Sequence, residues 1–201
     1  MKRHLLVVLL IVIFCEVFGS SQSSLFKYES LFPEKDFLTI YYYNMLYEST
    51  GNKHDIITST VIDVSLQENI NPIIMLALLD TENIKHNPKA KTFNYKKNKK
   101  GKKYIASIDE GLFQQNSRFL SYFIWKFWKE NHKFNKSSSE DSTRLAISIV
   151  KALLNQFNGD LSKAVMAYNA GANSILNNSI PKSTIRYMNT FFNYKNKMEG
   201  K

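Results

Sequence analysis

The chain has 201 residues, 44% of them hydrophobic and 13% aromatic, which is enough for one ordinary core and not clearly for two. Its formal net charge of +10 favours an anionic partner, such as nucleic acid, lipid headgroups or a cell-wall polymer. One cysteine in the whole sequence excludes a disulfide-stapled scaffold.

The N-terminus has the pattern of an export signal. Basic residues at positions 2–4 precede an uncharged run over residues 5–15, which is shorter than the roughly 20 apolar residues that span a bilayer. We expect cleavage after Gly19, with Ser21 as a second cleavage position and an uncleaved anchor as the alternative. Cleavage removes Cys15, so the mature protein would lack disulfides and thiolate metal ligands. It would be periplasmic or attached to the cell envelope, and we expect no nucleic-acid partner there.

The remaining chain divides by composition. Residues 20–34 are rich in serine and predict a linker, and residues 37–47 predict a short aromatic helix. We therefore assign residues 1–19 to the signal peptide and 20–53 to a linker with an N-terminal helical extension. Residues 54–195 form the main domain.

Residues 71–83 predict a helix that is buried on all sides. Asn71 is a favourable N-cap, Pro72 a favourable first helical residue, and residues 73–79 are all apolar. Glu82 lies at the end of this helix, where burial and the negative end of the helix dipole both oppose ionisation. Both effects should raise the pKa of Glu82, as a carboxylic acid requires if it donates a proton near neutral pH.

Five other stretches have the periodicity of helices, namely residues 55–68, 118–131, 145–157, 161–169 and 183–194. After the buried helix, the segment around residues 93–105 predicts either a β-hairpin with Gly101 near its tip or a disordered excursion. The expected fold class is therefore mainly α, with one small irregular or β-hairpin segment.

An aromatic stripe with helical spacing runs along residues 118–131. Its members are Phe119, Tyr122, Phe123, Trp125, Phe127 and Trp128. Aromatic residues at this spacing usually belong to the core, so we expect the stripe to be buried. A platform on which sugar rings stack is the alternative.

A run of lysines falls within the same segment as the predicted hairpin. It consists of Lys96, Lys97, Lys99, Lys100, Lys102 and Lys103. Such a run suits association with an anionic wall polymer or membrane surface, and a solvated loop is the alternative. The histidines at positions 54, 86 and 132 are scattered, so we expect surface or core histidines, with no metal and no cofactor.

Three segments combine residues suited to a polar carbohydrate. They are Glu82-Asn83, Gly111-Leu112-Phe113-Gln114 and Ala167-Tyr168-Asn169-Ala170-Gly171. In this order they resemble the soluble lytic transglycosylase family, whose motifs are Glu-Ser, Gly-Leu-Met-Gln and Ala-Tyr-Asn-Ala-Gly. Ile180-Pro181, Thr184 and Tyr187 after the third motif also fit. The resemblance covers about residues 54–195, which it identifies as a catalytic domain of the glycoside hydrolase family 23 type.

The resemblance implies a lysozyme-like fold and a lytic transglycosylase acting in cell-wall turnover. Glu82 matches the catalytic acid, which protonates the β-1,4 bond between N-acetylmuramic acid (MurNAc) and N-acetylglucosamine (GlcNAc) of peptidoglycan. It would then act as the base that closes a 1,6-anhydro ring on MurNAc. Gln114, Tyr168 and Asn169 match substrate-binding positions, and Thr92 lies near a serine of the family that binds the acid or the substrate.

Two other functions stay open. A hydrolytic muramidase of the lysozyme type needs a second carboxylate to position water, and only Asp109 and Glu110 are near the second motif. The family usually has small residues at these two positions. A catalytically silent peptidoglycan-binding protein is the third reading, in which the lysine run holds anionic polymer.

Overall fold

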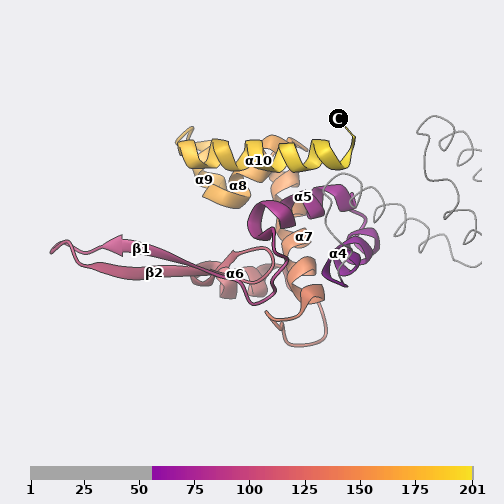
Figure 1. Ribbon diagram of the computed structural model, residues 1–201, viewed down its shortest axis with the longest axis horizontal. Coiled ribbons are helices and arrows are strands. Elements are labelled where there is room, and N and C mark those ends of the chain that lie inside the picture. Colours follow the sequence, from indigo (N-terminus) through magenta and orange to yellow (C-terminus); the bar gives the residue numbers. More distant parts are fainter. Residues whose placement is uncertain (1–55, 201) are drawn as a thin grey trace, which may run out of the picture. The chain divides into compact units, whose positions relative to one another are not determined.

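The computed structural model describes residues 56–200 (Figure 1). The predictions on residues 1–53, which concern the export signal, its cleavage, the linker and the short helix, lie outside the described residues. None of the helices over residues 56–200 combines the length and the hydrophobicity that a membrane-spanning helix requires.

Seven helices and three strands make up this part of the chain. The helices are α4 (Ile56–Gln67), α5 (Pro72–Asn83), α6 (Ser117–Phe127), α7 (Ser139–Gln156), α8 (Leu161–Ala170), α9 (Ala172–Leu176) and α10 (Lys182–Met198). The strands are β1 (Lys91–Lys97), β2 (Lys103–Glu110) and β3 (Gln115–Asn116). The prediction of a mainly α domain with a small hairpin segment is confirmed.

Helix α5 lies at the centre of the core, as its sequence predicts. Asn71 caps it, because the side-chain Oδ1 accepts a hydrogen bond from the backbone N–H of Ile73 at 2.9 Å. Six of the seven consecutive apolar residues that follow Pro72 are buried, all except Ile74. Helices α4 and α10 both pack against α5, and α7 packs against α4 and α8 (Figure 1). Burial on all sides therefore positions the last turn of α5, which carries Glu82.

The three strands form one antiparallel sheet in the order β1-β2-β3. Strands β1 and β2 make a hairpin that projects away from the helices (Figure 1). Its turn is closed by Asn98, whose Oδ1 accepts hydrogen bonds from the backbone N–H groups of Lys100 and Lys102 at 3.0 and 2.9 Å. Gly101 supplies the positive φ of 76° that this turn requires. Of the two readings of this segment, the hairpin is correct.

The prediction that the aromatic stripe is core is wrong. No side chain of α6 is buried, and Phe119, Tyr122 and Trp125 are 54%, 47% and 78% exposed. Helix α6 packs against β2, β3 and α7, which cover one side of it and leave the side with Tyr122 and Trp125 open. The rings contact one another along the helix instead, with centroids of Tyr122 and Trp125 6.1 Å apart.

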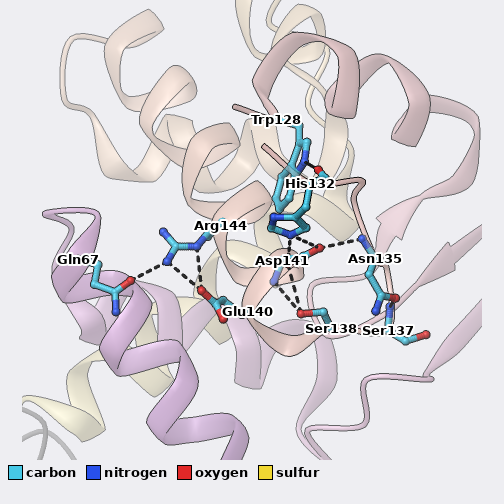
Figure 2. A network of polar contacts seen from close by, with 9 residues as sticks. All are labelled: Gln67, Trp128, His132, Asn135, Ser137, Ser138, Glu140, Asp141 and Arg144. Carbon is cyan, nitrogen blue, oxygen red and sulfur yellow. Dashed lines mark hydrogen bonds and ion pairs between the residues drawn. The ribbon is translucent and has the colours of Figure 1, made fainter. Parts of the chain in front are cut away.

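A polar network anchors the first turns of α7 (Figure 2). Arg144 donates hydrogen bonds to Glu68 at 2.8 Å, Gln67 at 2.6 Å and Glu140 at 2.9 Å, which joins α7 to the end of α4. Asp141 accepts from the backbone N–H of Asn135 at 2.8 Å and so holds the loop that enters α7. That loop also contacts the end of β2, because Lys136 donates a hydrogen bond to Glu110 at 2.9 Å. The second motif follows directly after Glu110.

Candidate active site

Glu82 is partly buried in the last turn of α5, and its carboxyl group receives a short hydrogen bond. The phenolic hydroxyl of Tyr187 on α10 donates to Glu82 Oε1 at 2.5 Å. Burial raises the pKa of Glu82 to about 8, the Tyr187 hydrogen bond opposes part of that rise, and the negative charge of Asp109 adds to it. The sequence predicts this direction. At neutral pH Glu82 is therefore mostly a protonated acid, able to donate.

The pKa values of two tyrosines respond to this acid. Burial raises the pKa values of Tyr168 and Tyr187 well above their usual range, and the charge of Glu82 raises both further. The hydroxyl of Tyr168 on α8 donates to the carbonyl of Phe113 at 3.1 Å, which joins the third motif to the second. Both tyrosines are therefore neutral hydrogen-bond donors at physiological pH.

Tyr187 is the contact to Glu82 that the site prediction leaves out. Its sequence signal is weak, because one tyrosine in the amphipathic helix α10 does not differ from the core tyrosines that such helices usually carry. Its place after the third motif fits the family pattern, and this was the available signal.

Gln114 and Thr92, two of the predicted substrate-binding residues, are hydrogen-bonded to each other. The hydroxyl of Thr92 on β1 donates to Gln114 Oε1 at 2.7 Å, and Gln114 Nε2 donates to the Gly111 carbonyl at 2.8 Å. Gly111 has a φ of 79°, and a Cβ there would lie 3.5 Å from the Lys136 carbonyl. The tight turn at Gly111 therefore places the side-chain amide of Gln114 against β1.

Asn169 has a different environment. Its Oδ1 accepts a hydrogen bond from the Thr184 hydroxyl at 2.9 Å, which ties the end of α8 to the start of α10. No side-chain hydrogen bond within residues 56–200 joins Asn169 to Glu82 or Gln114, and its bond to Thr184 places it at the helix junction. Asn83, which follows the acid, is also a tether: its side chain donates to the Asn87 carbonyl at 2.7 Å and fixes the turn after α5.

The two carboxylates near the second motif have separate surroundings. Asp109 on β2 accepts a hydrogen bond on each oxygen, from Asn116 Nδ2 at 2.6 Å and from Asn94 Nδ2 at 2.7 Å. Glu110 forms ion pairs with Lys136 at 2.9 Å and Lys91 at 3.2 Å. The Lys136 hydrogen bond is the main reason that the pKa of Glu110 is lowered.

Histidine and carboxylate side chains do not gather into a metal site in the described part of the chain. His86 is buried and its Nε2 lies 2.7 Å from Asp80 Oδ1 in the core, while Asp80 Oδ2 has no hydrogen-bond partner there. His132 lies 3.1 Å from Asp141 in the loop before α7. Both histidines therefore pair with a carboxylate as parts of the fold.

The fold has a known counterpart. The chain is similar to the X-ray structure of an inactive mutant of the lytic transglycosylase Slt from Pseudomonas aeruginosa, with a TM-score of 0.52 and 15% sequence identity. The similarity covers 85% of this chain and 31% of that chain, so this protein spans about a third of the length of Slt. It confirms the expected lysozyme-like fold. No curated protein matches the sequence.

The sequence itself matches a family profile over most of the described domain. Residues 59–184 match the transglycosylase SLT domain, and this stretch contains Glu82, the second motif and the third motif. The match covers well over half of the chain. The protein therefore belongs to the transglycosylase SLT domain family.

Proposed function

We propose that the protein is a lytic transglycosylase that cleaves the β-1,4 bond between MurNAc and GlcNAc in peptidoglycan. The observation that carries this proposal is the partly buried acid Glu82, whose pKa of about 8 keeps it protonated at neutral pH, beside the phenols of Tyr187 and Tyr168. A glycosidase acid has to donate its proton to the leaving oxygen, so it must be protonated at neutral pH, which requires a raised pKa.

The reaction needs one proton donor that later becomes a base. Glu82 gives its proton to the glycosidic oxygen as the bond from that oxygen to C1 of MurNAc breaks. The Glu82 carboxylate then takes the proton of the muramyl 6-hydroxyl while that oxygen bonds to C1, which closes the 1,6-anhydro ring without consuming water. In the first step the carbonyl oxygen of the 2-acetamido group bonds to C1 as the leaving oxygen departs, and the muramyl 6-oxygen displaces it from C1 when the ring closes. Tyr187 occupies Oε1, so Oε2 is the oxygen that carries the acidic proton.

The polar side chains around the acid suit the substrate. Gln114 and Thr92 form one hydrogen-bonded pair at the sheet, where the Thr92 hydroxyl oxygen and Gln114 Oε1 keep acceptor capacity that suits the O–H and N–H donors of a sugar. Tyr168 holds the second motif in place through the Phe113 carbonyl, and Asn169 fixes the junction of α8 and α10. We assign Tyr168 and Asn169 to positioning the segments around the acid.

The hairpin would bring the enzyme to its substrate. All six lysines of residues 96–103 are exposed, and residues 91–108 contain no acidic side chain. This charge suits an anionic wall polymer or membrane surface, in keeping with an exported protein that works in the periplasm or cell envelope.

The test is mass spectrometry of the products released from purified peptidoglycan sacculi, with the Glu82→Gln protein run in parallel. We expect muropeptides that end in 1,6-anhydro-MurNAc from the unmodified protein and none from the variant. Reducing-end products would instead make the protein a hydrolytic muramidase. Binding to sacculi without release of products by either protein would make it a silent wall-binding protein.

A further inference from the structure

Asp109 occupies a specific place on the sheet. In the antiparallel register of β1 and β2 it lies directly opposite Thr92, so the two side chains share one face of the sheet. Thr92 on that face donates to Gln114. Asp109 therefore shares the face of the sheet that carries Thr92, whose hydroxyl binds the Gln114 amide. Its negative charge also adds to the rise in the pKa of Glu82.

Two asparagine side chains, which share the hydroxyl of Ser107, hold Asp109 in one orientation. The amides of Asn94 and Asn116 each donate one N–H to Asp109 and one to the hydroxyl of Ser107, with the latter two bonds at 3.2 and 3.0 Å. Asn116 is in turn fixed as the N-cap of α6, where its Oδ1 accepts from the backbone N–H of Arg118 at 3.1 Å. A carboxylate has about four lone-pair positions, so two protein donors leave acceptor capacity for a ligand.

Glu110, one residue further along, does not share this arrangement. Successive side chains of a strand point to opposite faces, and Glu110 is engaged by Lys91 and Lys136. The local charge of Glu110 is compensated by two cations, whereas the hydrogen bonds to Asp109 come from neutral amides. Of the two carboxylates, only Asp109 presents an uncompensated negative charge on the face of Thr92.

We propose that Asp109 is a second catalytic carboxylate of this site, which stabilises the positive charge that develops at C1 of MurNAc while Glu82 protonates the leaving oxygen. The proposal rests on the proposed function. No bond forms to Asp109: the C1–oxygen bond breaks, its electron pair and the Glu82 proton leave with the GlcNAc hydroxyl, and the anion of Asp109 offsets the charge that remains on the sugar. The two carboxyl groups therefore have different roles, Glu82 as a neutral acid and Asp109 as an anion.

The variants Asp109→Asn and Asp109→Ala test this role, with Glu110→Gln as the matched control that removes one negative charge from the neighbouring residue. We expect kcat on soluble peptidoglycan fragments to fall at least about 10²-fold in both Asp109 variants, the size of effect seen when a preorganised electrostatic partner is lost. KM should change only a few-fold, and Glu110→Gln should retain the unmodified rate. Thermal unfolding and circular dichroism give the folded fraction, to which kcat is normalised.

The pH profile separates a catalytic role from a structural one. The charge of Asp109 raises the pKa of Glu82, so removing it should move the basic limb of kcat to lower pH, while Glu110→Gln should leave the limb in place. An unchanged kcat per folded molecule, or an unmoved limb, in either Asp109 variant would overturn the proposal. Failure of the proposed function would look different, because the unmodified protein would then release no anhydro product, or Glu82→Gln would still release it.

Discussion

The Tyr187 hydroxyl and Glu82 Oε1 are 2.5 Å apart, although the two residues are separated by 105 positions in the sequence. Their helices, α10 and α5, pack together, so the C-terminal helix sets the orientation of the acid. A phenol that donates to a carboxyl group stabilises its ionised form, which opposes the effect of burial on the pKa. Tyr187 therefore both fixes Glu82 and limits how far its pKa rises.

The variant Tyr187→Phe tests this dual role. Losing the hydrogen bond should raise the pKa of Glu82 further, so the basic limb of kcat should move to higher pH. The value of kcat at neutral pH should fall about tenfold or more, because the acid loses its orientation. The measurement is kcat against pH on soluble fragments, with Tyr194→Phe on the same helix as the control. A basic limb that stays in place would show that Tyr187 does not act on the acid.

Protein stability should also report the raised pKa. The pKa of Glu82 is about 8 in the folded protein and about 4.5 in an unfolded chain, so between these pH values the folded state binds more protons. The stability that protonated Glu82 contributes is present below pH 4.5 and is lost as the pH rises toward and through 8. Relative to Glu82→Gln, the unmodified protein should lose on the order of 1–3 kcal/mol of unfolding free energy between pH 5 and 8, after allowance for partial solvent access. Denaturant unfolding of both proteins at the two pH values measures this. A difference that is independent of pH would contradict the burial of an ionisable acid.

The lysine hairpin predicts salt-dependent binding to the wall. Replacing its six lysines by glutamine should weaken binding to sacculi and flatten its dependence on ionic strength, since exposed charges are screened over about 10 Å at 0.1 M salt. Turnover of soluble fragments should stay unchanged. The control replaces six exposed lysines elsewhere, namely Lys85, Lys89, Lys129, Lys133, Lys182 and Lys197. Equal loss of binding in both variants would assign the effect to net charge, and not to the hairpin.

The exposure of α6 predicts unequal costs for two aromatic substitutions. Trp125 is 78% exposed and Phe191 on α10 is 0% exposed. Trp125→Ser should therefore change the free energy of unfolding by no more than about 0.5 kcal/mol, whereas Phe191→Ala should cost about 3–5 kcal/mol. Urea unfolding of the two variants checks both numbers. A large loss for Trp125→Ser would mean that the outer face of α6 is covered in solution.

Much of the fold follows from local sequence signals. The cap at Asn71 with Pro72, and the apolar run after them, define α5 from local chemistry that tertiary contacts do not override. Gly101 in a polar turn indicates a hairpin but leaves a disordered excursion open, and the structure decides for the hairpin. The aromatic stripe of α6 fails as a predictor because periodicity shows which residues share a face, not whether another element covers that face. Coverage depends on how distant segments pack.

The residues of the site also differ in whether local sequence signals or long-range contacts identify them. Glu82, Gln114 and Tyr168 belong to short motifs, so their residue types and spacing are visible in the sequence. Tyr187 fits the family pattern, but the sequence does not reveal its contact with Glu82. The contacts of Asn94 and Asn116 with Asp109 are equally hidden in the sequence. Asn94 reaches Asp109 through the register of β1 and β2, which includes an irregularity between Asn94 and Tyr95. A shift by one residue would point Asn94 to the other face, so only the structure identifies these partners.

The most direct measurement is the titration of the Glu82 side chain itself. Glutamate labelled with ¹³C at the side-chain carboxyl reports each group's ionisation by NMR, and the Glu82→Gln protein identifies the resonance that belongs to Glu82. We predict a midpoint near pH 8, with a fall in Asp109→Ala and a rise in Tyr187→Phe. A midpoint at or below 4.5, the value for an exposed glutamate, would mean that Glu82 is ionised at neutral pH and cannot be the proton donor.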